Sequence, residues 1–292
     1  MLTKCSLLKT TAIACSIALI TLSAQAKSCL WKATSDKGTL YVQGSVHLLK
    51  ATDYPLAPAI EEAYAKSDVL VLEADMKAML STETQQLIMA KAMLPGGQTL
   101  EGSLSPEVYK LLSEKLTEAD LPIMVVQQFK PWFTAMTLML TKMQAMGFDP
   151  NLGLDQYFYN KATTDKKTVI GLETVKFQID LFDSLAEGNQ DAYMKRALKE
   201  LNLFETMLNE LMQSWKQGDI DGLGKIMLES FNEYPGLYDR FVVDRNKTWI
   251  KKIDDLASKH KTHMVVVGAA HLPREEGLLK LLEKKGFTLE QQ

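Results

Sequence analysis

Two histidines follow apolar runs in the same short motif, Gly-x-x-His-Leu. The first is His47 in "YVQGSVHLL", and the second is His271 in "VVVGAAHL". The chain contains 4 histidines in all, so this motif accounts for half of them. An imidazole can bind a metal ion or transfer a proton near neutral pH. A single His after a strand is more often a hydrogen-bonded structural residue, but the repeated motif favours a functional role for the two together.

Two glutamates end apolar runs elsewhere in the chain. Glu73 falls in "DVLVLEAD" at 68–75, and Glu173 falls in "KKTVIGLET" at 166–174. Burial of a carboxylate costs free energy unless a cation or a hydrogen-bond donor pairs with it. These carboxylates could therefore bind a metal ion or act as acids and bases, and the alternative is a salt bridge to an arginine. Asp75 is better explained as a helix N-cap or a solvated neighbour.

All four side chains would follow strands of one sheet. In open α/β sheets, ligands bind outside the carboxyl ends of the strands. Two imidazoles and two carboxylates at that edge would suit one divalent metal ion, with Mn, Fe, Co and Zn as candidates. A bound metal lowers the pKa of its water and polarises a carbonyl, which predicts metal-assisted hydrolysis with a glutamate as base. The predicted metal ligands are His47, His271, Glu73 and Glu173.

This prediction sets a distance that the structure must satisfy. Metal–ligand bonds are about 2 Å long, so imidazole rings more than about 10 Å apart could not share one ion. The glycines of the two motifs would allow close approach, because a residue without a Cβ leaves room for a ligand or a metal.

A basic side chain adds to the predicted site. Arg245 in "DRNKTW" could stabilise an anionic intermediate, because a guanidinium pairs well with carboxylates and oxyanions. The alternative is an ion pair with Asp244 or Glu73. The predicted catalytic residues are Glu73, Glu173 and Arg245.

Other residues that could do chemistry have plainer explanations. His260 and His263, in "KHKTH", are expected in a solvated turn. Cys29 has no nearby partner that would make it a nucleophile. The sequence contains no Gly-x-Ser-x-Gly elbow, no His-Glu-x-x-His pair, no phosphate-binding glycine loop and no dinucleotide fingerprint. A methionine-rich helix is expected to serve core or interface packing, which leaves a homodimer open. Its methionines are Met136, Met139, Met143 and Met146.

The elements that would position these residues alternate along the chain. A helix with Ser105 as N-cap follows the third strand-like run, and a last helix stops at Gly286. Strands that alternate with helices predict an α/β fold, in which a central, largely parallel sheet, mixed or split, is flanked by helices. The strands are expected at 29–35, 38–47, 68–75, 166–174 and 262–271, with a short edge strand at 287–291.

The first 26 residues have the pattern of an export signal, with a basic start, a short apolar run and a small-residue cleavage site after Ala26. Export of this type predicts a periplasmic protein. Two lysines leave with the signal, which takes the formal net charge from −3 to −5. This acidity argues against a nucleic-acid partner. One cysteine remains and no transmembrane segment follows, so we predict a single domain at 27–292 with helical insertions at about 80–165 and 175–260.

With these motifs the chain resembles the TraB/GumN family, which is related to the Tiki proteases and more remotely to the erythromycin esterases and the ChaN haem-binding group. The resemblance covers almost the whole chain after the signal. It implies an α/β fold with a split sheet and, for the Tiki branch, a metal-dependent protease activity associated with Mn or Co. The segments that carry it are "GSVHLLKATDYPLAPAIEEAYAKSDVLVLEADM", "GLDQYFYNKA", "GLETVKFQIDLFDSL", "WKQGD", "DRNKTW" and "VVVGAAHLPREEGLLKLLEKKGF".

The resemblance also implies which positions matter. The two motif histidines and the two strand-end glutamates match family positions, and Arg245 with Asn246 matches a basic pair. Asp155, in "GLDQYF", matches a recurrent position without a chemical role that the sequence can supply.

Three hypotheses are consistent with the sequence. The first is a periplasmic metal-dependent hydrolase, a peptidase rather than an esterase, with a peptide or small-molecule substrate. The second is a non-catalytic protein that binds haem, a metal or a peptide in the same crevice. The third is a scaffold in which the strand-end residues form a buried ion-pair network.

Overall fold

The structure is a computed structural model. It describes residues 27–292 apart from 187, 232–234 and 260. The predicted export signal at 1–26 and His260 therefore lie outside the described residues. No helix in the described part of the chain is long and apolar enough to cross a membrane.

The described residues form one six-stranded sheet with the strand order β4-β3-β5-β2-β1-β6. The four strands from β4 to β2 are parallel to one another, while β1 is antiparallel to both β2 and β6. This arrangement confirms the predicted α/β fold with a largely parallel sheet. The strands are β1 Leu30–Ser35, β2 Gly38–Ser45, β3 Val69–Ala74, β4 Thr168–Glu173, β5 His263–Gly268 and β6 Thr288–Gln291.

The strand register brings the carboxyl ends of the parallel strands to one edge of the sheet. Ser45 of β2 lies opposite Gly268 of β5, and Ala74 of β3 lies opposite Glu173 of β4. All residues of β3 and β5 are buried, which explains their continuous apolar sequences, because a parallel strand is covered on both faces. His263 begins β5 and is 1% exposed, so the expectation that it lies in a solvated turn was wrong.

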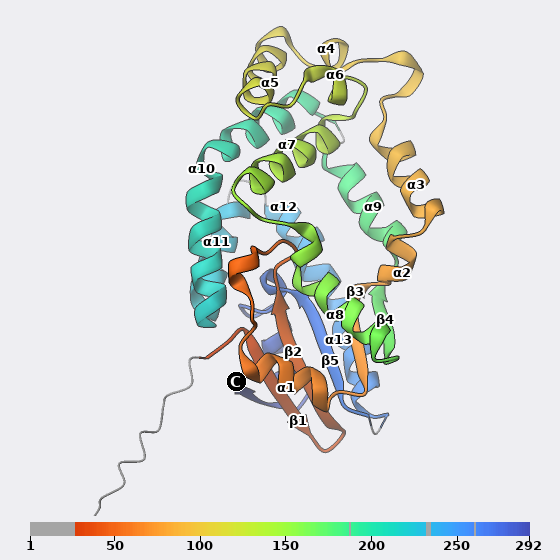
Figure 1. The fold of residues 1–292 in the computed structure, drawn as a ribbon, viewed down its shortest axis with the longest axis vertical. Helices are drawn as coiled ribbons and strands as arrows, with labels where there is room; N and C mark the ends of the chain where they lie inside the picture. Colours follow the sequence, from red (N-terminus) through yellow and green to blue (C-terminus); the bar gives the residue numbers. More distant parts are fainter. Residues whose placement is uncertain (1–26, 187, 232–234, 260) are drawn as a thin grey trace, which may run out of the picture.

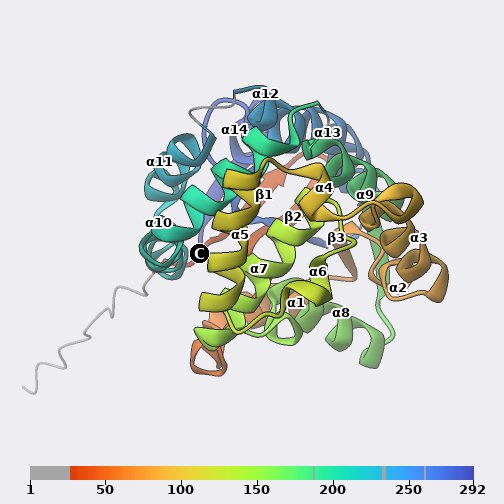
Figure 2. The same cartoon turned by 90° about the horizontal axis from the view of Figure 1, so that it is seen from above.

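Helices cover both faces of the sheet and extend beyond its carboxyl edge. Figure 2 shows α1 and α8 on one side of the sheet, and α13 and α14 on the other. In Figure 1, helices α3 to α7 and α9 lie above the sheet, and the long helix α10 runs down beside it. The helices are α1 Pro58–Lys66, α2 Met76–Met79, α3 Thr82–Ala92, α4 Leu100–Ser103, α5 Pro106–Glu118, α6 Ile123–Val126, α7 Pro131–Ala145, α8 Leu154–Thr164, α9 Val175–Asp183, α10 Gln190–Gln217, α11 Ile220–Phe231, α12 Pro235–Tyr238, α13 Asp244–Ala257 and α14 Leu278–Lys284.

Local sequence signals explain several helix ends. The Ser105 side chain accepts a hydrogen bond from Val108 N–H at the start of α5, as predicted for an N-cap. Asp75 caps α2 in the same way. Gly286 follows α14 with a φ of 89°, the left-handed conformation that ends helices. The same helix begins at Leu278, directly after Gly277, where the chain turns so tightly that a Cβ would meet the backbone carbonyls of Leu272 and Pro273.

Candidate active site at the carboxyl edge of the sheet

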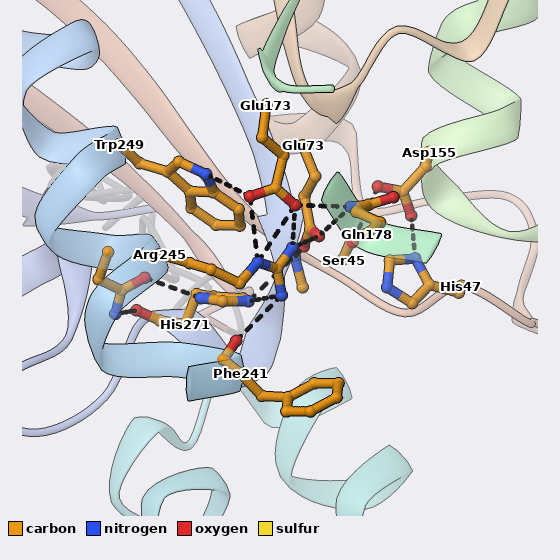
Figure 3. Close-up of polar contacts among 12 residues, drawn as sticks. Ser45, His47, Glu73, Asp155, Glu173, Gln178, Phe241, Arg245, Trp249 and His271 are labelled. Atoms are coloured by element: carbon orange, nitrogen blue, oxygen red, sulfur yellow. Dashed lines mark hydrogen bonds and ion pairs between the residues drawn. The ribbon is translucent and has the colours of Figure 1, made fainter. Parts of the chain in front are cut away.

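The four predicted strand-end residues lie together in space (Figure 3). His47 follows β2, Glu73 lies in β3, Glu173 ends β4, and His271 lies in the 3₁₀ turn after β5. A Cβ placed on Gly268 would be 3.1 Å from Glu73 Oε1, 3.6 Å from His271 Cδ2 and 3.8 Å from His47 Nε2. Both imidazole rings therefore reach the same point, and the distance required for a shared site is satisfied.

Arg245 of α13 lies at the centre of this group. Its Nη2 donates to Glu73 Oε2 and, at 2.7 Å, to Glu173 Oε1, while its Nε donates to Glu173 at 3.1 Å. Its Nη1 donates to Phe241 O at 3.0 Å and contacts His271 Nε2 at 3.1 Å. A guanidinium has five N–H groups, so these partners use all of its donors. Both ion-pair alternatives considered from the sequence, an arginine for the glutamates and Glu73 for Arg245, are present.

A π-helical turn brings the Phe241 carbonyl to this guanidinium. Residues Asp239–Val243 form the turn immediately before α13, and Asp244 N–H donates to Asp239 O, five residues back. Such turns interrupt the regular i to i−4 pattern of an α-helix. The interruption lies next to Arg245 and places a backbone acceptor beside its side chain.

Glu173 is held entirely by the protein. Besides Arg245, its carboxylate accepts hydrogen bonds from Gln178 Nε2 at 2.9 Å and from Trp249 Nε1 at 3.0 Å. Trp249 also stacks on the guanidinium, whose carbon lies 4.5 Å from the ring centroid. Trp249 and Arg245 are four residues apart and share a helix face. The four-residue spacing from Arg245 could have identified Trp249 as a site residue from the sequence. No such spacing indicated that Gln178 belongs to the site.

Glu73 is an ionised carboxylate in a buried position. Burial alone would raise its pKa, but interactions with His271, Arg245 and His47, together with the Gly268 N–H at 2.7 Å, hold that pKa at about 2. The absence of a side chain at Gly268 leaves room for the Glu73 oxygen. The glycine of the first motif has a different task, since a Cβ at Gly44 would come within 2.5 Å of Cys29 Sγ.

His271 is a buried, neutral imidazole. Burial lowers its pKa to about 3, and the charge of Arg245 acts in the same direction. Because Nε2 faces a guanidinium donor, Nδ1 carries the proton and donates to Asn246 Oδ1 at 2.7 Å. Asn246 Nδ2 in turn donates to the carbonyls of His271 and Glu276. The role of Asn246, which the sequence left open, is to fix the orientation and tautomer of this ring.

His47 differs from the other site residues because its side chain is 60% exposed. Its Nδ1 lies 2.8 Å from Asp155 Oδ2, and the other oxygen of Asp155 accepts from Ser45 Oγ at 3.2 Å. Its Nε2 has no hydrogen-bond partner among the described residues and is directed toward Gly268 and Glu73. Asp155 thus has the role that the sequence could not supply, as the carboxylate that orients His47.

Gly153 allows α8 to deliver Asp155 to this position. A Cβ on Gly153 would lie 2.0 Å from His47 O, a distance that no side-chain atom can occupy. The next residue, Leu154, donates its N–H to Val46 O at 3.1 Å. The φ of Gly153 is −57°, so close backbone approach rather than backbone conformation requires the glycine.

We expect Gly153→Ala to separate the start of α8 from the His47 segment. The clash is with backbone and cannot be relieved by a rotamer change, so the free energy of unfolding should fall by about 1–3 kcal/mol. Thermal and denaturant unfolding would measure this loss. Gly102→Ala is a suitable control, because a Cβ there would meet only Thr99 Oγ1 at 3.8 Å. Equal stability of Gly153→Ala and wild type would contradict the close contact.

The contact with Asp155 also predicts the titration of His47. The negative charge of Asp155 stabilises the imidazolium and raises the pKa of His47 to about 9, above its ordinary 6.5. Asp155→Asn should move the pKa of His47 back toward or below 6.5, because the amide keeps the size of the side chain and removes its charge. Titration of the His47 ring by NMR would test this. A pKa near 6.5 in both wild type and Asp155→Asn would contradict the ion pair between His47 and Asp155.

Arg245 already contacts three of the four predicted metal ligands. The described residues contain no group of three or more His, Cys, Asp or Glu side chains placed to hold a metal ion. Arg245 contacts both glutamates and His271 Nε2, and an ion bound there would compete with its guanidinium. His47 Nε2 and Glu73 Oε1 are the donor atoms that face the open side of Gly268. The metal site stays a prediction.

Fold and site together define the class of this protein. It is an α/β protein whose parallel strands carry a polar site at their carboxyl edge, where a buried guanidinium lies near an Asp–His pair with an exposed imidazole. The sequence profile described as the TraB/PrgY/gumN family matches residues 29–291, nearly the whole chain, and the chain belongs to that family. Comparison with curated proteins and with solved structures gave no match.

Proposed function

We propose that this protein is a hydrolase of amide or ester bonds in which His47 is the reacting side chain. One observation carries the proposal: Asp155 orients the ring through Nδ1, while the side chain is 60% exposed and its Nε2 has no hydrogen-bond partner among the described residues. An imidazole that is oriented on one side and open on the other is the arrangement of a general base. The remaining polar groups of the site hold one another.

The chemistry of His47 follows from this geometry. In its neutral form, Nε2 removes a proton from a water molecule, and the resulting hydroxide attacks the substrate carbonyl. The protonated ring then gives the proton to the leaving group, while the Asp155 carboxylate stabilises the imidazolium. Because only the neutral ring is a base, activity should rise as the pH rises through the elevated pKa of His47.

We assign the buried residues to positioning. All five donors of Arg245 are used within the protein, so its guanidinium holds Glu73 and Glu173 rather than a reaction intermediate. Glu73 remains ionised beside His47 and adds to the negative potential that favours the imidazolium. Each buried charge of this network is compensated only when its ion-pair partners are present.

A metal-dependent form of this proposal uses the same residues. His47 and Glu73 would be ligands. His271 would be a third ligand if Arg245 moved away from the Nε2 atom of His271. A divalent ion there would polarise the substrate carbonyl. Metal analysis of the purified protein decides between the two forms. Stoichiometric metal that is lost from both His47→Ala and His271→Ala would support the metal-dependent form, while full activity after chelation would exclude it.

Two further parts of the proposal come from the sequence. A peptide is the proposed substrate class, in line with the resemblance to the Tiki proteases. The periplasm is the proposed location, because residues 1–26 have the pattern of an export signal. Cell fractionation tests the location. The full chain should be recovered in the periplasmic fraction, and a chain that lacks residues 1–26 should not.

Hydrolysis itself can be tested without a known substrate. The protein should cleave members of a diverse peptide library, detected by mass spectrometry of new termini, or hydrolyse p-nitrophenyl acetate. Asp155→Asn and His47→Ala serve as matched variants of the same preparation. Cleavage that persists equally in His47→Ala would show that another group, or a contaminant, does the chemistry. A visible haem absorbance band in the purified protein would instead support a binding protein.

A further inference from the structure

An apolar cleft lies between α7 and α10, next to the candidate active site. Its volume is about 420 Å³, within the range of small-molecule sites. A second cleft of about 420 Å³ lies on the other side of Met139 and Glu200, which line both. We call the first one the α7–α10 cleft. Most of its lining side chains are apolar, among them Leu48, Met136, Met139, Leu140 and Ala197.

We infer that the α7–α10 cleft binds a long acyl chain attached to the scissile carbonyl of the substrate. This inference rests on the proposed hydrolase function and names the substrate group that the site would select. Leu48, which lines the cleft, is bonded directly to His47, so consecutive residues form a wall of the cleft and carry the reacting imidazole. His47 lies at a bend after β2, so the chain turns between the end of the strand and this wall of the cleft.

The lining chemistry favours an acyl chain over a peptide segment as the occupant of the cleft, so the peptide substrate proposed above would carry its acyl chain at the scissile carbonyl. A bound peptide brings backbone N–H and C=O groups, which cost free energy when they are buried without partners. Three of the side chains that line the cleft are polar. Thr137 Oγ1 already donates to Phe133 O and the Glu200 carboxylate is paired with Arg196 at 2.5 Å, so the Tyr193 hydroxyl is the remaining side-chain group for a peptide backbone. An acyl chain needs no hydrogen bonds. Methionine side chains adapt to such a chain because they are flexible and polarisable.

The size of the exposed apolar surface argues against a second protein copy as the occupant. Among the described residues of α7 and α10, the large hydrophobic side chains that are exposed are Met136, Leu140 and Leu203, at 39%, 38% and 59%. A stable protein–protein interface needs roughly 20–30 residues on each side. Met136 and Leu140 line the α7–α10 cleft, whereas Leu203 lines the second cleft, and two exposed side chains suit the rim of a small-molecule site.

Binding can be measured without turnover. The neutral apolar dye N-phenyl-1-naphthylamine should bind the intact protein with a rise in fluorescence, and dodecanol should displace it. Ala197→Trp fills the cleft and Leu140→Glu places a charge at its rim, so each should weaken dye binding at least tenfold. Thr206→Trp on the same helix is the control, because Thr206 is exposed and lines neither cleft, and its dye affinity should stay within twofold of wild type.

Turnover then tests whether the bound chain belongs to the substrate. Burial of each methylene should raise kcat/KM about fourfold, so p-nitrophenyl decanoate should exceed the acetate by more than a hundredfold in wild type. This ratio should collapse below tenfold in Ala197→Trp and stay intact in Thr206→Trp. The variant His47→Ala should lose turnover and keep dye binding.

The outcomes separate the two proposals. Dye binding that is lost in the cleft variants, with no ester or amide turnover by wild type, would refute the hydrolase and leave an apolar ligand site. Rates that do not depend on acyl length, or dye affinity that is unchanged in both Ala197→Trp and Leu140→Glu, would overturn the acyl-chain inference. A dimer that dissociates in Leu140→Glu would assign the cleft to a second copy and also overturn it.

Discussion

Arg245→Met should lower the free energy of unfolding by about 3–5 kcal/mol, because it leaves two buried carboxylates without their cation. Glu73 and Glu173 are 9% and 8% exposed in their side chains, so water cannot replace the guanidinium. The side chain of methionine is close to that of arginine in length, so the loss would reflect charge and hydrogen bonding rather than a cavity. Denaturant unfolding at pH 7 measures the change.

The pH dependence of this loss has a definite sign. In wild type the pKa of Glu73 is lowered, so its contribution is present above its unfolded value and is lost as the pH falls toward 2. In Arg245→Met, burial without the guanidinium should raise the pKa of Glu73, so protonation relieves the burial of its charge as the pH falls. The stability gap between the two proteins should therefore shrink from pH 8 to pH 5.

A triple variant is the matched control for this prediction. Arg245→Met combined with Glu73→Gln and Glu173→Gln removes the cation and both anions together. It should recover much of the stability, since a buried network costs most when one partner is removed alone. Equal stability of wild type and the single variant at pH 7 would contradict the description of the network.

His47→Ala should lower kcat/KM by about 10²–10⁴-fold, the range that general acid–base catalysis contributes. The pair with Asp155 is lost, but the His47 side chain is 60% exposed, so the free energy of unfolding should fall by only about 1 kcal/mol. A large loss of activity with a small loss of stability distinguishes a reacting group from a structural one. Parallel rate and unfolding measurements on the same preparation provide the test.

His271→Ala is the comparison for His47→Ala. His271 is 4% exposed and is held between Arg245 and Asn246, so its loss should reduce stability as well as activity. If the two histidine variants showed the same stability loss, the distinction between an open and a buried imidazole would be wrong.

The sequence predicted the fold well because the fold depends on local patterns. The valine run of β5 and the apolar run of β3 are buried along their whole lengths, as continuous hydrophobicity predicts for parallel strands. Parallel strands end at the same edge, so the convergence of His47 with His271 followed from topology alone. Details of capping, such as those at Ser105 and Gly286, followed from single residues.

The pairing of polar groups could not be predicted in the same way. Asp155 lies 108 residues from His47, and no periodicity relates one to the other. Their contact depends on the approach of α8 to the backbone of the His47 segment, which Gly153 permits. Arg245 was placed with Glu73 as one alternative, but the sequence could not indicate that it also pairs with Glu173 and uses all its donors within the protein. Long-range hydrogen bonds of this type depend on side-chain geometry that residue spacing does not encode.

The central claim is that Asp155 acts through His47, and a double-mutant cycle in kcat/KM tests it most directly. The cycle compares wild type, Asp155→Asn, His47→Ala and the double variant on one substrate at one pH. Residues that act as a unit show strongly non-additive losses. We predict that Asp155→Asn lowers the rate in wild type and has no further effect once His47 is absent. Losses that multiply in the double variant would contradict the claim.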